Sequence, residues 1–446
     1  MNSNNNSLMR LIAEPCNKVS GEVLCPGDKS ISQRIVMLGS LLDHDLKVEN
    51  FLSAADPIST MSALERVGFK YQYLHDLDTV NILNSKKRVT DPDSTLNLGN
   101  SGTGLRLMLG FLGGLNIKAG YIGDNSLSAR PMARVLDPLS QMGIKYNSNA
   151  GKLPINYINS TPIKSFSYKL PVASAQVKSS ILLAGLCSGA EIEIIEPTAT
   201  RDHTERMLEF LGAKIEVDII GDGRKIKLSG QLDSEVTYYD VPGDFSSAAF
   251  LIISALITKD SDLLIKNVGI NKTRSGLLDV LLEMGADIKL TNQQNVMNEP
   301  RADIRVKSSE LHGINIGGSI IANLIDEIPI LCIAASFASG QTKIEGAEEL
   351  RVKESDRLNA VARGLERLEI NFVELDDGII IDGGNNVNVK NININSYHDH
   401  RIAMSFLIAS LRSTEAITVD DCSNIETSFP SFMHVMNQIG LKIHEA

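Results

Sequence analysis

Apolar and polar positions along the chain follow a plan that recurs six times. Each copy has an extended segment, then a short polar tip containing Ser, Asp or Asn, then a run rich in Leu, Ile and Ala. Because such side chains cap the free N–H groups at a helix start, each copy predicts a buried helix that begins at its polar tip. The tips lie at residues 26–30, 99–103, 171–176, 242–246, 325–327 and 397–400.

A second pattern follows each of these helices. It consists of an apolar helix end, a glycine and a segment typical of a strand, as expected where the backbone turns left-handed after a helix. The glycines are Gly68, Gly143, Gly212, Gly285 and Gly440, and the fifth copy has Glu369 instead. The copies lie about 70 to 85 residues apart. Solenoid repeats are far shorter, ~20 to 50 residues, so each copy predicts a small α/β layer.

The interleaving of helices and strands predicts the α/β class. Expected strands include residues 79–83, 115–120, 191–196, 263–268, 378–381 and 416–419. With 446 residues, the chain exceeds the ~250 to 300 at which single cores stop growing, so we expect two domains of three repeats. Pro-Gly turns place them at about 27–242 and 243–446, and composition does not assign residues 8–26 to either half.

Composition narrows the possible functions. A net charge of -11 argues against a nucleic-acid partner but permits a local cationic cleft for a small anion. Five cysteines without metal-ligand spacing predict reduced core thiols. No apolar run approaches the ~18 to 20 residues of a membrane span. The polar start, residues 1–7, lacks a signal layout, so we expect a flexible tail on a cytoplasmic protein.

Cations gather at or near the predicted helix starts. A helix N-terminus attracts anions, so several of them aimed at one cleft would form an anion-binding site. One such arginine usually lies on a solvated face, whereas several at equivalent places in a repeat indicate a shared function. The residues are Lys29, Arg34, Arg106, Lys178 and Arg401 at the first helices, and Arg130, Arg201, Arg274, Arg351, Lys353 and Arg357 before the second helices.

Asp326 and Glu354 are the acids of interest in this cationic setting. A site that neutralises phosphates needs few carboxylates unless they move protons. Alternatively, Asp326 only caps its helix and Glu354 only pairs with Lys353 and Arg357. Their spacing leaves both interpretations open.

Five motifs occur in the order found in the 5-enolpyruvylshikimate-3-phosphate synthase family, which the chain resembles over nearly its whole length. They are residues 26–30 (Pro-Gly-Asp-Lys-Ser), 99–103 (Gly-Asn-Ser-Gly-Thr), 130–132 (Arg-Pro-Met), 351–357 (Arg-Val-Lys-Glu-Ser-Asp-Arg) and 399–401 (Asp-His-Arg). The resemblance implies an inside-out α/β barrel in each of two domains, built of three βαβαββ units, with the chain start joining the second domain and a cleft between the domains.

The resemblance also implies a reaction. The enolpyruvyl group of phosphoenolpyruvate is transferred to the 5-hydroxyl of shikimate 3-phosphate, and phosphate is released by addition and elimination in the shikimate pathway. The implied partners are these two substrates and the inhibitor glyphosate. No metal or organic cofactor is implied, and we expect a monomer.

The site residues follow from the motifs. Those implied for shikimate 3-phosphate are Lys29, Ser30, Arg34, Ser174, Ala175, Gln176, Arg201, Asp326 and Lys353. Those implied for phosphoenolpyruvate are Lys29, Gly102, Arg130, Gln176, Arg357 and Arg401. Asp326 would accept the 5-hydroxyl proton, and Glu354, with Lys29, would protonate the methylene carbon.

Two departures from the family pattern bear on inhibition. Thr427 stands where one branch of the family has a lysine for the phosphoenolpyruvate phosphate, and residues 173–179 and 201–205 resemble the other branch. Glyphosate-tolerant members of that branch carry alanine at the position of Gly102. Because glycine is present here, we expect sensitivity to glyphosate.

Two rival functions remain at this point. UDP-N-acetylglucosamine enolpyruvyl transferase shares the fold and reaction type, but it uses a mobile-loop cysteine that no cysteine here matches, and it lacks the motif at 351–357. A non-catalytic repeat scaffold that binds a polyanion is the alternative from another class. Phosphate release from phosphoenolpyruvate with shikimate 3-phosphate separates the three.

Overall fold

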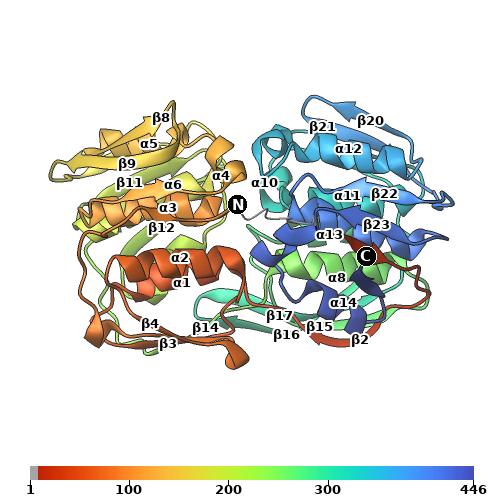
Figure 1. Ribbon diagram of the computed structural model, residues 1–446, viewed down its shortest axis with the longest axis horizontal. Coiled ribbons are helices and arrows are strands. Elements are labelled where there is room, and N and C mark those ends of the chain that lie inside the picture. The colour runs from red at the N-terminus through yellow and green to blue at the C-terminus, as the bar shows by residue number, and fades with distance from the viewer. Residues whose placement is uncertain (1–8) are drawn as a thin grey trace, which may run out of the picture. The chain divides into compact units, whose positions relative to one another are not determined.

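The computed structural model describes residues 9–446, so the tail expected at residues 1–7 lies outside the described residues. The chain divides into two compact units (Figure 1). Of the described residues, unit 1 comprises 9–26, Gly243–Gln294 and Arg301–Ala446. Unit 2 comprises Gly27–Pro242 and the short segment Asn295–Pro300.

Every sheet has four strands in the same order, and one copy illustrates it. Its elements are β6 (Leu96–Asn97), α3 (Gly102–Gly114), β7 (Gly120–Ile122), α5 (Ala133–Gln141), β8 (Ile144–Asn149) and β9 (Lys152–Ser160). The sheet order is β6-β7-β9-β8, with β6 and β7 parallel and the other pairs antiparallel. This is a βαβαββ unit, and six such sheets confirm the predicted α/β class.

Two further copies are continuous in the chain. One consists of β10 (Phe166–Lys169), α6 (Ala175–Ser188), β11 (Ile192–Glu196), α7 (His203–Phe210), β12 (Lys214–Ile220) and β13 (Gly223–Ser229). The other consists of β18 (Asn315–Ile316), α11 (Ile328–Phe337), β19 (Gln341–Ile344), α12 (Arg357–Arg367), β20 (Phe372–Leu375) and β21 (Gly378–Asp382).

The remaining three copies take one strand from a distant part of the chain. The first has β14 (Tyr238–Asp240) with α1 (Lys29–Gly39), β3 (Leu46–Glu49), α2 (Ala55–Arg66), β4 (Tyr71–Leu74) and β5 (Thr79–Ile82). The fourth has β2 (Ser20–Leu24) with α8 (Phe245–Ile257), β15 (Asp262–Gly269), α9 (Gly276–Glu283), β16 (Asp287–Val296) and β17 (Glu299–Lys307). The sixth has β22 (Ile392–Asn395), α13 (His400–Ala409), β23 (Ile417–Asp420), α14 (Phe432–Gln438), β24 (Ile443–Glu445) and β1 (Leu11–Ala13).

The first strands of two copies are exchanged. β2 leads directly into α1 but pairs in parallel with β15, whereas β14 leads into α8 but pairs in parallel with β3. Main-chain bonds flank the exchange, because Asp28 N donates to Pro242 O at 2.8 Å and Asp244 N donates to Pro26 O at 2.7 Å. The two Pro-Gly-Asp motifs therefore mark the points where the chain passes from one unit to the other.

The predicted left-handed turns are present in all six copies. The five glycines after the second helices have φ between 81° and 113°. Glu369 adopts the same kind of conformation, with a φ of 56°, although it has a side chain. The repeat pattern therefore specifies the backbone even where the glycine is replaced.

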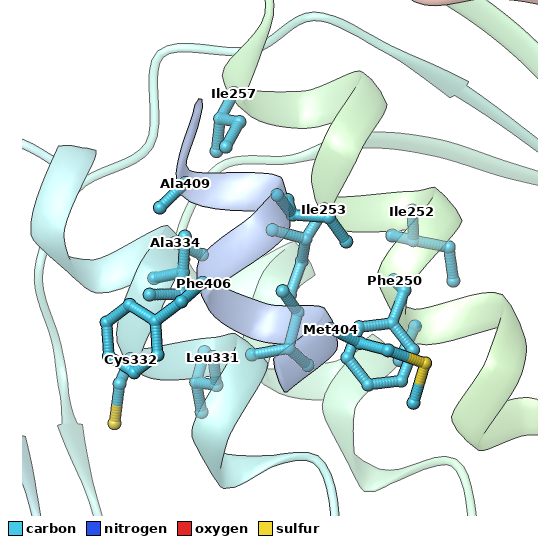
Figure 2. Packing of buried hydrophobic residues seen from close by; sticks show 14 of the residues in the cluster. Phe250, Ile252, Ile253, Ile257, Leu331, Cys332, Ala334, Met404, Phe406 and Ala409 are labelled. Atoms are coloured by element: carbon cyan, nitrogen blue, oxygen red, sulfur yellow. The ribbon is translucent and has the colours of Figure 1, made fainter. Parts of the chain in front are cut away.

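Helices α8, α11 and α13 are buried along their whole length and form the core of unit 1 (Figure 2). Figure 2 shows Phe250, Leu331, Met404 and Phe406 gathered between these three helices. The described part of the chain contains no helix long and apolar enough to span a membrane.

The strand predicted at residues 115–120 is wrong. Leu115 caps α3, Asn116 turns left-handed with a φ of 59°, and Ile117 N bonds back to Leu112 O, so the strand begins only at Gly120. All five cysteines are free; Cys25, Cys332 and Cys422 are buried, whereas Cys16 and Cys187 are only partly buried. Burial raises the pKa of Cys332 and of Cys422 to about 12, so neither is poised as a nucleophile.

Candidate active site

Arg357, the first residue of α12, holds together the predicted site residues of unit 1. Its side chain is 1 % exposed, and it donates to Asp399 Oδ2 at 2.8 Å, to Asp326 Oδ1 at 3.0 Å and to Glu354 Oε2. Burial alone would lower the pKa of Arg357, but the charges of Asp399, Glu354 and Asp326 raise it well above its usual value. Three carboxylates therefore fix one permanent cation.

Asp399 orients both arginines of this cluster. It caps α13, where Oδ1 accepts the Arg401 backbone N–H at 2.9 Å while Oδ2 accepts from Arg357. Arg401 in turn donates through Nη1 to the main-chain oxygen of Asp326 at 2.9 Å. The helix start thus brings the two predicted phosphoenolpyruvate residues to one place.

The carboxylates differ in their access to a ligand. The Asp399 side chain is fully buried, whereas those of Asp326 and Glu354 are 14 % and 19 % exposed. Lys353 lies 3.5 Å from Asp326. The two acids predicted for proton transfer are thus the more accessible ones. Glu354 does pair with Arg357, as its alternative interpretation required, whereas the N-cap position of α11 is Glu327 and Asp326 pairs with Arg357.

In unit 2, Gly102, Arg130 and Gln176 meet around the start of α3. Ser101 caps this helix through Gly104 N at 3.0 Å. Arg130 donates to Asn100 Oδ1 at 2.7 Å and to Ser126 Oγ at 3.1 Å. A Cβ atom added to Gly102 would lie 2.9 Å from an Nη1 atom of Arg130. The predicted Gly102 and Arg130 are therefore neighbours.

Gln176 is held in this cluster by two hydrogen bonds. Its Oε1 accepts from Arg106 Nη1 at 2.9 Å, and its Nε2 donates to Thr103 Oγ1 at 2.8 Å. Ser174 and Ala175 begin the same helix, α6, and Ser174 Oγ caps it by accepting from Val177 N at 3.4 Å. The start of α6 therefore adds three of the predicted residues to this region.

Arg34 occupies a buried place on α1. It is 4 % exposed and donates to Thr204 Oγ1 at 2.8 Å and to Ser179 Oγ at 3.0 Å, while a third bond reaches Ser30 O at 3.0 Å. Burial, helped by the charge of Arg201, lowers the pKa of Arg34 to about 10, although the charges of Asp28 and Glu205 act in the opposite direction. Arg34, Ser30 and Arg201 thus form a second predicted group of unit 2.

Lys29 pairs with Asp56, which the sequence analysis did not predict. Its Nζ lies 3.2 Å from Asp56 Oδ2, and its side chain is 17 % exposed. Asp56 is the acid in the first turn of α2, a position where a carboxylate also favours the helix dipole. Thr427 has a neutral side chain and supplies no charge, and its hydroxyl donates to Asn424 O at 2.7 Å within its own turn.

Several contacting residues were missed or left unassigned by the sequence analysis. Asn100, Asp399, Ser246 and Glu327 were quoted only as parts of motifs and received no role. Arg106 and Arg274 were recognised as cations at helix starts but received no role. In residues 9–446 no group of three or more His, Cys, Asp or Glu could hold a metal ion.

Comparisons with known proteins agree over nearly the whole chain. The family profile described as EPSP synthase (3-phosphoshikimate 1-carboxyvinyltransferase) matches residues 13–436. The 3-phosphoshikimate 1-carboxyvinyltransferase of Petrotoga mobilis is 44% identical over 436 residues, covering 97% of this chain and 99% of that protein. The enzyme of the same name from Hydrogenovibrio crunogenus is 43% identical, covering 96% and 97%.

Solved structures show the same relationship. EPSP synthase from Acinetobacter baumannii has 39% sequence identity and a TM-score of 0.85, covering 98% of this chain and 100% of that one. The enolpyruvyl transferase NikO from Streptomyces tendae has a TM-score of 0.78 at 17% identity and shares the fold. On these grounds, the chain belongs to the EPSP synthase family of transferases, the 3-phosphoshikimate 1-carboxyvinyltransferases.

Proposed function

We propose that the protein transfers the enolpyruvyl group of phosphoenolpyruvate to the 5-hydroxyl of shikimate 3-phosphate and releases phosphate. The supporting observation is the cluster of unit 1, where the buried Arg357 contacts Asp326 and Glu354, and Asp399 orients Arg357 and Arg401. Fixed guanidinium groups suit both carboxylate and phosphate. Partly exposed carboxylates beside them suit proton transfer.

Each group of residues has a part in this reaction. Lys29, Ser30, Arg34, Ser174, Ala175, Gln176, Arg201, Asp326 and Lys353 bind shikimate 3-phosphate. Lys29, Gly102, Arg130, Gln176, Arg357 and Arg401 bind phosphoenolpyruvate. The proposal requires the clusters of both units to act on the same pair of substrates.

The chemistry consists of an addition and an elimination. As the 5-hydroxyl oxygen of shikimate 3-phosphate attacks C2 of phosphoenolpyruvate, Asp326 takes the proton of that hydroxyl. Glu354, with Lys29, protonates the methylene carbon. The tetrahedral adduct then loses phosphate from C2 while Glu354 takes back a proton from the methyl carbon, which re-forms the carbon–carbon double bond as the enol ether of the product. The fixed cations stabilise the charge that develops on the leaving phosphate, and they need no rearrangement to do so.

Glyphosate should inhibit the protein despite motifs that resemble the tolerant branch of the family. Gly102 leaves room beside Arg106 and Arg130. We also propose that the protein acts in the cytoplasm as a monomer and without a metal or organic cofactor.

A phosphate-release assay tests the function. Phosphate should appear only when shikimate 3-phosphate and phosphoenolpyruvate are both present. Phosphate release that requires UDP-N-acetylglucosamine instead, or that occurs without any acceptor, would contradict the proposal. The molar mass of the purified protein, measured by light scattering, tests whether it is a monomer.

A further inference from the structure

Glu327 carries a buried carboxylate with no part in the chemistry described above. It directly precedes α11, and its side chain is 1 % exposed. It accepts from Arg274 Nη1 at 2.8 Å, from Arg401 Nη1 at 3.3 Å and from the hydroxyl of Ser246. A charge buried this deeply is costly unless it is paired, so these contacts account for its presence in the core.

Arg401 is held from three directions. Besides Glu327, its Nη1 donates to the main-chain oxygen of Asp326 at 2.9 Å, and its Nη2 donates to Ser246 Oγ at 2.9 Å. A guanidinium has five N–H donors. Among the residues that the structure describes, these contacts use three side-chain donors of Arg401 and leave two for a ligand.

Arg274 and Asp244 complete the cluster. Arg274 Nη2 lies 3.3 Å from Asp244 Oδ1 and also donates to Ser246 Oγ. Two cations and two carboxylates therefore balance around one serine hydroxyl on α8. Without the charge of Glu327, Arg274 would lose its 2.8 Å ion pair and Arg401 would lose one of its three fixed contacts.

We propose that Glu327, with Ser246, is a positioning residue for Arg401 and through it for phosphoenolpyruvate. This inference rests on the proposed function, in which Arg401 binds that substrate. The carboxylate fixes the plane of the Arg401 guanidinium before the substrate arrives, so binding does not have to order the side chain. The same contacts tie Arg401 to the main chain beside Asp326, the proposed proton acceptor.

Steady-state kinetics of Glu327→Gln in the full-length protein tests the inference. Charge-assisted hydrogen bonds are the strong ones, so we expect the KM for phosphoenolpyruvate to rise by about tenfold or more. The KM for shikimate 3-phosphate should change less than about threefold. An equal rise in both KM values, or unchanged values in a folded variant, would overturn the inference.

Two serines on α8 provide a matched comparison. Ser246→Ala removes the hydroxyl that contacts Arg401, whereas Ser254→Ala removes an equally buried hydroxyl that only donates to Phe250 O of its own helix. We expect the KM for phosphoenolpyruvate to rise in Ser246→Ala alone. If Glu327→Gln does not fold, the two serine variants test the inference through the same quantity, the KM for phosphoenolpyruvate. An equal KM for phosphoenolpyruvate in both variants would contradict the inference.

The double variant Glu327→Gln with Arg274→Gln separates positioning from charge balance. Removing one cation and one anion restores neutrality, so the melting temperature should recover while the KM for phosphoenolpyruvate stays raised. If the melting temperature and the KM for phosphoenolpyruvate both return to their wild-type values, Glu327 has a structural role and does not position Arg401. A wild-type protein that does not release phosphate from the two substrates would refute the proposed function, and the inference with it, whereas an active wild type with unaffected variants refutes only the inference.

Discussion

Side-chain exposure distinguishes the acids of the unit 1 cluster. Asp399 is completely buried and holds two arginines, so it suits a fixed support. Asp326 and Glu354 contact the same Arg357 but remain partly exposed. Sequence spacing alone could not make this distinction, because all three acids precede or begin helices in similar ways.

The first prediction concerns these two exposed acids. Asp326→Asn and Glu354→Gln should each lower kcat at least about tenfold, because general acid–base groups contribute on the order of 10²- to 10⁴-fold. Glu366→Gln is a suitable control, since Glu366 pairs with Arg363 on the exposed surface of α12 and should leave kcat unchanged. A folded Asp326→Asn variant with near-normal turnover would leave Asp326 only its pairing role.

A second prediction concerns Gly102. A Cβ atom there would lie 2.9 Å from Nη1 of both Arg106 and Arg130. Both contacts are the ends of flexible side chains, so Gly102→Ala should displace them without unfolding the helix. Glyphosate is longer than phosphoenolpyruvate, so its inhibition constant should rise more than the KM for phosphoenolpyruvate.

Inhibition assays with Gly317→Ala control for an added methyl group. A Cβ atom at Gly317 meets nothing closer than 3.8 Å. The inhibition constant of glyphosate and the KM for phosphoenolpyruvate should therefore both stay unchanged in Gly317→Ala. Weak inhibition of the unmodified protein by glyphosate would show that residues other than Gly102 determine the response.

At the scale of elements, the hairpin of β16 and β17 belongs to unit 1, but its tip at 295–300 belongs to unit 2. Met297 and Asn298 form a two-residue turn with φ of 53° and 63°, as the tight turns of hairpins require. The tip is anchored by Glu299, whose Oε1 lies 2.7 Å from Nδ1 of the buried His203, and by Asn298 O, which accepts from Arg206 at 2.8 Å.

This anchor predicts a pH dependence of stability. Burial alone would lower the pKa of His203, but the charge and hydrogen bond of Glu299 raise it above 6.5. The charged histidine therefore contributes stability that is fully present below about pH 6.5 and is lost as the pH rises through the folded-state pKa. Wild-type protein should exceed Glu299→Gln in unfolding free energy most at pH 5 to 6, and the difference should shrink towards pH 9.

Denaturant titrations of the wild-type protein and Glu299→Gln between pH 5 and 9 measure this difference in unfolding free energy. The contributions of groups that titrate identically in the two proteins cancel in the difference. A gap between the two that stays constant or widens with rising pH would contradict the assigned role of His203.

The repeated elements were predictable because their signals are local. A capping residue followed by an apolar run, and a left-handed position after a helix, lie within a few residues of each other, and even Glu369 follows the rule. The pairing of β14 with β3 and the anchored tip at 295–300 were not predicted, and the placement of the chain start with the second half was implied only by the family resemblance. Strand partners and ion pairs of this kind, such as His203 with Glu299, depend on residues far apart in the sequence.

At the scale of the whole molecule, β1 lies between β23 and β24 in the last sheet. Without it, β23 would become an edge strand that pairs only with β22, and β24 would lose its partner in the sheet. Ala446 N donates to Arg10 O at 3.1 Å, so the chain ends of this sheet already meet at a hairpin position.

This geometry predicts that unit 1 can be made as a single rearranged chain. A protein running from residue 243 to 446, then through a short glycine-rich turn to residues 9–26, should fold with one cooperative thermal transition. The same chain without residues 9–26 lacks β1 and β2 and should aggregate or fail to unfold cooperatively. Circular dichroism melting of the two constructions is the measurement, and equal behaviour would show that the two strands are dispensable.

The placement of β1 also has a consequence for synthesis on the ribosome. Glu14 and its spatial neighbour His444 are separated by 430 positions in the sequence. At a translation rate of ~5 to 20 residues per second, the ribosome adds His444 roughly 20 to 90 s after Glu14. During that time the apolar Leu-Ile-Ala strand has left the exit tunnel, while both strands that will flank it are still untranslated. The nascent chain therefore carries a hydrophobic strand without its partners until β23 and β24 have been made.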